Sequence, residues 1–260
     1  MKLNKRFILM AVGFFIFFVS YNHQAKAETA PCPKEASATT NAETPTKKVL
    51  LIATDGMEDI EIAAVREICG WTKVVEDIDH VDVQIGAWDN PVHLFHGTNI
   101  IPDLDMKNAN IDDFDAIVIP GGWPGTKFFE LTFSDEFANF LKKAHEKNKL
   151  IVAHCFGILP IANSGIIKGK QATIFTSNTP LKCEEFKGKL IQMGVKYVDE
   201  AIHYEDNVMS SIGPAVANEV AFQLVEKLIG TESTKKIQDM MMWQNVAPED
   251  LKWTAPTRKK

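Results

Sequence analysis

Short, wholly apolar runs alternate along this chain with segments whose apolar residues follow helical spacing. These patterns predict buried strands at residues 49–53, 81–87, 116–119 and 150–153. Helical spacing predicts helices at 58–69 and 134–147, and Gly70 is expected to end the first of them. Because strands and helices alternate, the chain is predicted to form an α/β domain with a mostly parallel sheet.

The second half of the chain continues the alternation. Residues 169–177 and 209–212 predict further strands, and residues 215–229 predict a strongly amphipathic helix. A last helix is expected over 231–245, carrying the sequence MMMW at 240–243. This stripe of methionines and tryptophan either packs onto the same domain, which is the ordinary role, or forms a face that binds a partner.

The N-terminal 27 residues differ from the rest of the chain. Three basic residues precede an apolar run at 7–19, and the small residues Ala25 and Ala27 follow it. This order is typical of a cleaved secretory signal, because the apolar run is short for a membrane anchor. We therefore expect export, into the periplasm if the source is bacterial.

Composition divides the remainder into three parts. Residues 28–46 lack large apolar side chains and are expected to be a disordered leader. The folded domain is expected at 47–230, and 231–260 form a C-terminal extension consisting of a helix and a basic tail. The role of this extension is left open.

Charge narrows the possible partners. The chain has 260 residues, of which 28 are basic and 34 acidic, and the expected signal at 1–27 holds four of the basic residues and none of the acidic ones. The mature chain then has 24 basic and 34 acidic residues, a net charge of −10. Without a basic patch, it is not expected to bind nucleic acid or an anionic membrane, and no membrane span remains after cleavage.

Four cysteines are present, at positions 32, 69, 155 and 183. Their spacing matches no known metal site, so we expect neither a metal nor a cofactor. Export would place them in an oxidising compartment, where a pair such as Cys32 and Cys183 could form a disulfide. Which of Cys32, Cys69 and Cys183 are paired is left open by the sequence.

Cys155 is the main candidate for chemistry. It follows a buried strand directly, and Gly157 leaves room for the backbone to turn sharply into the next helix. This strand-turn-helix arrangement is that of a nucleophile elbow, where the first N–H groups of the helix favour a thiolate. The alternative is a cysteine that serves only as a small buried hydrophobe.

Two further strand ends are expected to meet Cys155, because the carboxyl ends of parallel strands lie at one edge of a sheet. The N–H groups of Gly122 and Phe156 could form an oxyanion hole, although Pro-Gly-Gly sequences are also common in turns. Glu61 has apolar neighbours in the sequence, and burial would raise its pKa. Alternatively, Glu61 is a solvated residue in an acidic helix start.

The chain resembles the ThiJ/PfpI superfamily, which includes the Parkinson-disease protein deglycase and shares its core with class I glutamine amidotransferases. Four motifs carry the resemblance over 47–230, namely 57–61 (MEDIE), 116–122 (AIVIPGG), 151–157 (IVAHCFG) and 210–214 (SSIGP). The resemblance implies a flavodoxin-like three-layer sandwich with helices on both faces of the sheet. It also implies a homodimer.

The resemblance also assigns roles in the site. It places Glu61 against Cys155, where a protonated carboxyl would exchange protons with a substrate or hydrogen-bond to the thiolate. It assigns the oxyanion donors to the N–H groups of Gly122 and Phe156. Many members carry a histidine directly after the cysteine or at the end of the next strand, where this chain has Phe156 and Phe175.

Three histidines of this chain are candidates for the base that many members of the superfamily have at those positions. His154 precedes Cys155 and should point to the opposite face, so we interpret it as structural. His96 could reach the site of a neighbouring subunit in a dimer like that of the family. His203 is a further possible base.

Three functions are consistent with these residues. The leading hypothesis is glyoxalase or deglycase chemistry on a small carbonyl substrate, a 2-oxoaldehyde or its adduct, with Cys155 as nucleophile and Glu61 moving protons. The second is a redox-sensing chaperone or stress protein of the cell envelope, in which Cys155 is oxidised. The third is a cysteine amidase or peptidase, which would need His96 or His203 near the sulfur.

Overall fold

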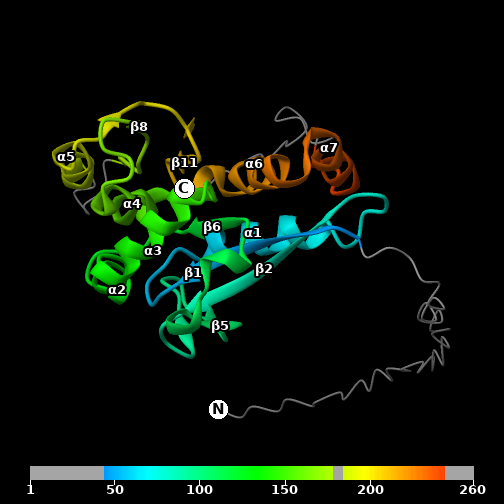
Figure 1. Ribbon diagram of the computed structural model, residues 1–260, viewed down its shortest axis with the longest axis horizontal. Coiled ribbons are helices and arrows are strands. Elements are labelled where there is room, and N and C mark those ends of the chain that lie inside the picture. Colours follow the sequence, from blue (N-terminus) through cyan, green and yellow to red (C-terminus); the bar gives the residue numbers. More distant parts are fainter. Residues whose placement is uncertain (1–43, 178–183, 244–260) are drawn as a thin grey trace, which may run out of the picture. The chain divides into compact units, whose positions relative to one another are not determined.

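The fold is described from a computed structural model, which describes residues 44–177 and 184–243 (Figure 1). Its centre is a seven-stranded sheet in the order β10-β11-β7-β6-β1-β2-β5. The strands are β1 (Thr46–Ala53), β2 (His80–Ala87), β5 (Leu104–Asp105), β6 (Ala116–Ile119), β7 (Leu150–His154), β10 (Ile202–Glu205) and β11 (Val208–Ser211). All neighbouring pairs are parallel except β10 and β11, which confirms the mostly parallel sheet.

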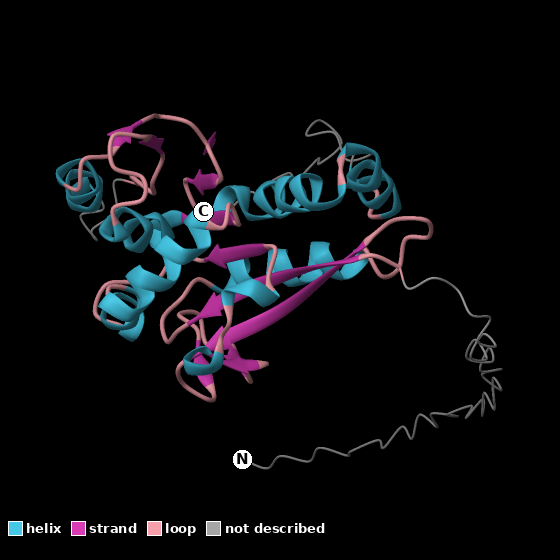
Figure 2. Cartoon of the chain, viewed as in Figure 1, coloured by secondary structure: helices cyan, strands magenta, loops and turns pink. Residues whose placement is uncertain are grey.

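Helices cover both faces of this sheet, as Figure 2 shows. The helices are α1 (Asp59–Trp71), α2 (Lys127–Thr132), α3 (Asp135–Glu146), α4 (Ile158–Ser164), α5 (Glu184–Gln192), α6 (Ala217–Ile229) and α7 (Thr231–Met240). Helices α1 and α6 pack against each other and against β2, whereas α3 packs against α2, α4 and β7. The described part of the chain therefore has the expected sandwich of flavodoxin-like type.

The strands at the centre of the sheet form where their sequences are wholly apolar. Every residue of β6 and β7 is buried, as are the last five residues of β1. Such strands are stable only with helices on both faces, because both rows of side chains must leave water. The expected strand at 116–119 is confirmed residue for residue, and those expected at 49–53, 81–87, 150–153 and 209–212 differ from the observed strands by one to three residues at an end.

The predicted end of the first helix was wrong. Gly70 lies inside α1, which ends at Trp71, and Thr72 follows it. The Thr72 hydroxyl donates to the Cys69 carbonyl at 2.6 Å and accepts from the N–H of Val81 in β2 at 2.9 Å. Because this side chain ties the end of α1 to β2, the helix needs no left-handed glycine there.

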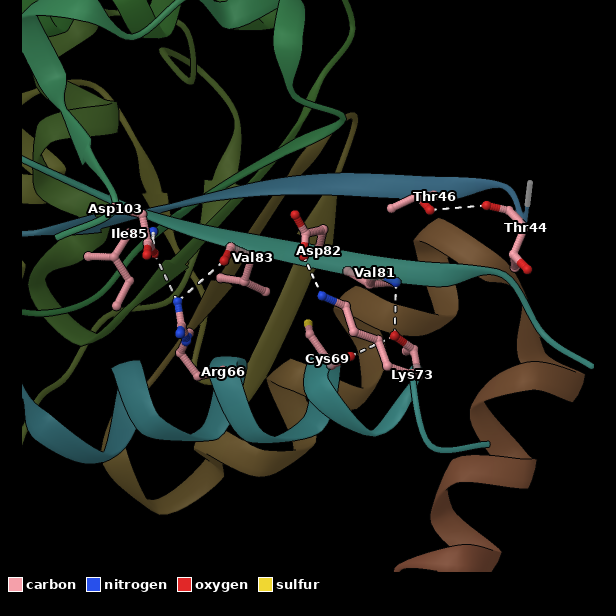
Figure 3. A network of polar contacts seen from close by, with 11 residues as sticks. Thr44, Thr46, Arg66, Cys69, Lys73, Val81, Asp82, Val83, Ile85 and Asp103 are labelled. Atoms are coloured by element: carbon pink, nitrogen blue, oxygen red, sulfur yellow. Dashed lines mark hydrogen bonds and ion pairs between the residues drawn. The ribbon is translucent and has the colours of Figure 1, made fainter. Parts of the chain in front are cut away.

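Polar contacts also fix the long axis of α1 along β2. Arg66 donates to Asp103 at 3.0 Å and to the carbonyl of Val83 at 3.3 Å, and Lys73 pairs with Asp82 at 2.5 Å (Figure 3). These groups are exposed, so each pair contributes little to stability by itself. The position of α1 over the sheet is therefore set mainly by its buried apolar face, with Ile62, Val65 and Ile68 in the core.

The strand expected at 169–177 was also largely wrong. Only β8 (Gln171–Ala172) forms, and it pairs with β9 (Lys196–Tyr197) outside the main sheet. The N–H of Thr173 donates to the side-chain hydroxyl of Ser210 in β11 at 3.0 Å, where a strand would donate to a backbone carbonyl. The remaining small sheet joins β3 (Val92–His93) to β4 (Asn99–Ile100).

Short 3-10 turns connect several elements: η1 (Met106–Asn108), η2 (Ile111–Asp113), η3 (Cys155–Gly157) and η4 (Pro214–Val216). The helix expected at 215–229 therefore begins as α6 at Ala217. Helix α7 ends at Met240, earlier than expected, and packs against α6. Ile237 is buried and the Trp243 ring lies 5.1 Å from that of Phe222, so α7 docks onto its own domain, whereas the side chains of Met240 and Met242 are exposed.

Several expectations fall on residues that the structure does not describe. The signal at 1–27, most of the leader at 28–46 and the basic tail lie outside the described residues, as do Cys32 and Cys183. Within residues 44–177 and 184–243, no helix combines the length and the apolar character that crossing a membrane requires.

Candidate functional site

Three strand ends converge at one edge of the sheet, as the sequence predicted. Met57, after β1, forms an isolated antiparallel bridge with Gly122, after β6. Two hydrogen bonds hold this bridge, from the Glu58 N–H to the Gly121 carbonyl at 2.9 Å and from the Trp123 N–H to the Gly56 carbonyl at 3.0 Å. The bridge fixes the start of α1 directly against the turn that follows β6.

Cys155 lies at a strained turn between β7 and α4. Its φ is +53°, in the left-handed region that residues with a Cβ seldom occupy. The close approach of this turn to the end of β6 requires Gly157, since a methyl group there would lie 2.1 Å from the Ile119 carbonyl oxygen. Strain of this kind is typical of a nucleophile elbow, and the structure has that geometry at the expected residue.

Glu61 is completely buried in the first turn of α1. Its Oε2 accepts a hydrogen bond from the N–H of Gly121 at 2.6 Å. Its Oε1 is also buried and has no hydrogen-bond partner among the described residues. One oxygen therefore anchors the carboxyl, and the other is left for a proton or a substrate.

Burial raises the pKa of Glu61 to about 8. The hydrogen bond from Gly121 opposes this shift because it favours the carboxylate, and the nearby charge of Glu58 adds to it. Glu61 is thus protonated over most of the neutral range. This excludes the alternative that Glu61 is an ordinary solvated surface residue.

Glu61 and Cys155 face the same small space. A methyl group on Gly121 would lie 3.0 Å from Cys155 Sγ and 3.2 Å from Glu61 Oε2. A methyl group on Gly213, before α6, would lie 3.1 Å from Cys155 Cβ and 3.4 Å from Glu61 Oε1. Both glycine positions are therefore too crowded for a side chain, and each lies against both Cys155 and Glu61.

The expected oxyanion donors lie beside this space. The Gly121 N–H is occupied by Glu61, and the Trp123 N–H by Gly56, whereas the Gly122 N–H makes no hydrogen bond to a described residue. A side chain at Gly122 is excluded because a methyl group there would meet the Phe128 ring at 2.3 Å. Phe156 directs its buried ring away into an aromatic cluster. The use of the two N–H groups as an oxyanion hole remains a prediction.

The three histidines occupy different environments. His154 is completely buried, its Nδ1 lies 3.4 Å from the Ser211 hydroxyl, and burial lowers its pKa to about 3. It therefore stays neutral, as a structural residue would. His203 pairs with Glu200 at 2.8 Å.

His96 lies against the start of α1. Its Nε2 is 3.2 Å from Glu58 Oε1, and its backbone N–H donates to Asp59 at 2.8 Å. Glu58 also accepts from the Trp123 indole at 3.0 Å. The carboxyl of Glu58, which His96 contacts, is also the group whose charge helps to raise the pKa of Glu61.

Sequence patterns gave no role in the site to two of its contributors, Gly213 and Phe175. Both lie beside Cys155, yet each comes from a loop without a periodic pattern. Phe175 was noted only as a residue that stands where a histidine might be. These loops follow different strands and meet only in the folded protein, so the spacing of residues within one segment does not reveal that they are neighbours.

No group of three or more His, Cys, Asp or Glu side chains suited to a metal ion exists in the described ranges. The other described cysteine, Cys69, is fully buried in α1, and burial raises its pKa to about 12. It is therefore a poor nucleophile and a small core residue.

Comparison with known proteins extends these observations. Residues 47–227 match the DJ-1/PfpI family. Glutathione-independent glyoxalase DJR-1.2 of Caenorhabditis elegans is 32% identical over 152 residues, covering 58% of this chain and 75% of that protein. Putative cysteine protease YraA of Bacillus subtilis is 27% identical over 171 residues, covering 65% and 90%. The crystal structure of Drosophila melanogaster DJ-1beta matches with a TM-score of 0.64 at 22% identity, covering 76% of this chain and 98% of that one.

Proposed function

Because this chain belongs to the DJ-1/PfpI family, we propose that it is a cysteine-dependent enzyme that converts 2-oxoaldehydes to 2-hydroxy acids, or acts on their adducts. One observation carries the proposal: a buried glutamic acid with a pKa of about 8 shares a small space with a cysteine on a strained elbow. This pair can supply both a nucleophile and a proton carrier. The name of the Caenorhabditis elegans relative supports the same chemistry.

The first step is addition of the thiolate to the aldehyde. The sulfur of Cys155 bonds to the aldehyde carbon, and the electron pair of the carbonyl moves to its oxygen. That oxygen takes the proton of Glu61, which gives a hemithioacetal and leaves Glu61 as a carboxylate. In this proposal the N–H groups of Gly122 and Phe156 stabilise the negative charge that develops on the oxygen.

The second step moves hydrogen within the adduct. The Glu61 carboxylate removes the proton from the former aldehyde carbon, giving an enediolate, and returns it to the neighbouring carbon. The hydroxyl proton of the first carbon passes to the second oxygen, so the product is a thioester of a 2-hydroxy acid. Water then cleaves the thioester, Glu61 takes up one proton, one proton goes to solvent, and the thiolate is restored.

The pKa of Glu61 suits both steps. A general acid and base works best when its pKa lies near the working pH, because both forms are then available. An ordinary glutamate would be ionised at neutral pH and could not donate in the first step.

The direct test is formation of lactate from methylglyoxal by the wild type and by the Cys155→Ala and Glu61→Gln variants. We expect turnover in the wild type and a loss of at least about a hundredfold in each variant, the range for a general acid or base. Cys69→Ala is the matched control, because it removes a thiol that is buried away from the site. Equal rates in wild type and Cys155→Ala would exclude the proposal.

The same proteins distinguish the alternatives. Cleavage of peptides by the wild type but not by Cys155→Ala, without lactate, would favour the protease chemistry that the Bacillus subtilis relative's name indicates. Oxidation of Cys155 by mild peroxide ahead of the other cysteines, without turnover of either substrate, would favour a redox sensor.

Export is part of the proposal and is supported by the basic, apolar and small residues of 1–27. We expect the protein recovered from outside the cytoplasm to begin at Glu28, which its intact mass would establish. Recovery of the chain with residues 1–27 attached, in the cytoplasm, would contradict this assignment.

A homodimer is likewise proposed. Ile60 in α1 and the loop residues Phe95 and Ile101 are exposed apolar side chains, which a second copy could cover. Light scattering should give twice the mass of the mature chain, and the mass of a monomer at micromolar concentration would contradict it.

A further inference from the structure

A cavity of about 340 Å³ lies between α3 and the 3-10 turn η1, and none of its lining residues belongs to the site around Cys155. Its apolar lining is largely aromatic, with Trp88 after β2, Phe137 and Phe140 on α3, and Met106 on η1. Volumes from about 300 Å³ upward are typical of sites that hold a small organic molecule. The cavity is therefore large enough for a ligand and apolar enough to gain from burying one.

The aromatic rings of the lining hold one another in place. Phe137 is buried, its ring meets that of Trp88 edge to face at 5.5 Å and 76°, and it lies nearly parallel to that of Phe140 at 6.1 Å. Trp88 and Phe140 are only partly buried, so each leaves part of its ring surface uncovered. A planar aromatic group in the cavity can cover these surfaces and make ring contacts of the same kind. An aromatic ligand is thus favoured over an aliphatic one of equal size.

The charged groups of the lining are mainly cationic. Lys107 on η1 and Lys143 in the last turn of α3 both line the cavity, and neither ammonium group makes an ion pair or hydrogen bond with a described residue. Lys147, one turn beyond Lys143, is by contrast paired with Asp112. A carboxylate in the cavity would give the two lysines a counter-ion beside an apolar surface.

One acidic residue, Glu136, also lines the cavity. It lies in the first turn of α3, seven residues before Lys143, so two turns of helix, or roughly 10 Å, separate the two positions. Asn139 lies between them on the same face and has a neutral amide that can donate to an anion. Negative charge therefore occupies one end of the cavity only, and a carboxylate bound near Lys143 avoids it.

We propose that this cavity is a binding site for a small aromatic carboxylate, whose ring lies against Trp88 and Phe140 and whose carboxylate pairs with Lys107 and Lys143. Ring contacts and ion pairs hold this ligand, and no bond to it forms or breaks. The site does not depend on the reaction proposed for Cys155, so each can be tested without the other.

Three probes with one ring system test the class of ligand. 2-Naphthoate, 2-naphthamide and 2-naphthylmethylamine carry a negative, a neutral and a positive group on the same naphthalene ring, and isothermal titration calorimetry with the full chain gives a Kd for each. We expect the carboxylate to bind roughly tenfold more tightly than the amide, and the amine to bind most weakly. The preference for the carboxylate should decrease at high salt, because partly exposed ion pairs are screened.

Substitutions separate the ion pairs from the ring contacts. Lys107→Ala and Lys143→Ala should each weaken naphthoate binding about threefold and leave naphthamide binding unchanged, because only the carboxylate pairs with a lysine. Phe140→Ala should weaken the binding of both probes roughly tenfold, because it removes a ring that they cover. Lys142→Ala is the matched control, since it removes the same charge from the neighbouring position of α3, which does not line the cavity.

Acetylation of lysines locates the ligand without any substitution. When the protein is treated with dilute acetic anhydride and its peptides are analysed by mass spectrometry, naphthoate should slow the labelling of Lys107 and Lys143 and not that of Lys142. Equal binding of carboxylate and amide, equal losses in Lys142→Ala and Lys143→Ala, or unprotected lysines would overturn the proposal. Tightest binding of the amine would show that Glu136 sets the specificity and would overturn the anionic class. Absence of binding by all three probes at millimolar concentration would show that the cavity is not a site for aromatic ligands.

Discussion

Replacing Glu61 by glutamine should change how the stability of the protein depends on pH. Glutamine has nearly the shape of a protonated glutamate, and its oxygen can accept the hydrogen bond that Gly121 now gives to Oε2. It differs in that it cannot ionise. The variant therefore isolates the cost of charging this one buried group.

The magnitude follows from the two states of the carboxyl. Burial raises the pKa of Glu61 from 4.5 to about 8 in the folded chain. Below about pH 4.5 both folded and unfolded chains hold the proton, so stability does not depend on this group. Between about 4.5 and 8 only the folded chain holds it, and each pH unit then lowers the free energy of unfolding by about 1.4 kcal/mol. From pH 5 to pH 8 the loss is about 4 kcal/mol, and it levels off above the folded pKa.

Urea denaturation, followed by tryptophan fluorescence at pH 5, 6, 7 and 8, measures this loss. The free energy of unfolding of Glu61→Gln minus that of its parent should rise by about 4 kcal/mol over this range. Both proteins should carry Cys155→Ala, so that the thiol does not titrate. Glu67→Gln, an exposed position on the same helix, should run parallel to the parent. A constant difference between pH 5 and pH 8 would refute the assignment of a protonated, buried Glu61.

Other substitutions test the packing around the site. In Gly121→Ala the new methyl group would lie 2.5 Å from Cys155 Cβ, so we expect lactate formation to fall at least about tenfold and stability by about 1–3 kcal/mol; unchanged activity would contradict the tight contact. Gly157→Ala should destabilise by about 2 kcal/mol or more in urea, because its methyl would meet a carbonyl oxygen of β6 at 2.1 Å. Gly70→Ala, with nothing within 4 Å, should instead stabilise α1 by up to about 1 kcal/mol, and a loss of stability there would contradict its placement within the helix. Iodoacetamide should modify Cys155 in the folded protein and Cys69 only after unfolding, as peptide mass spectrometry would detect; modification of both at equal rates would contradict the burial of Cys69.

Much of the fold could be predicted from the sequence because its central strands must be apolar on both faces. The run at 116–119 has no other reasonable structure once helices flank it, and the resemblance to the ThiJ/PfpI superfamily is confirmed by the match over residues 47–227. The errors fell where a single side chain decides the outcome. Thr72 ends α1 in place of Gly70, and Ser210 takes the N–H of Thr173 that a longer strand would have used.

The site could be predicted only in part. The position of Cys155 after a buried strand indicated an elbow, and the structure has the strained φ there. The pKa of Glu61 depends on burial by other elements, and the sequence offered only its apolar neighbours as a sign. Phe175 lies in a loop that is distant from Cys155 in the sequence and close to it in the folded protein, so residue spacing could not predict their contact.

The central claim is that Cys155 and Glu61 act as one catalytic unit. The most direct test is kcat/KM for methylglyoxal in wild type, Cys155→Ala, Glu61→Gln and the variant with both changes. If each residue acts only together with the other, either single change should lower kcat/KM about as much as both changes together. The second change then removes a group that has already lost its function. Losses that multiply in the double variant, or single variants as active as the wild type, would contradict this account.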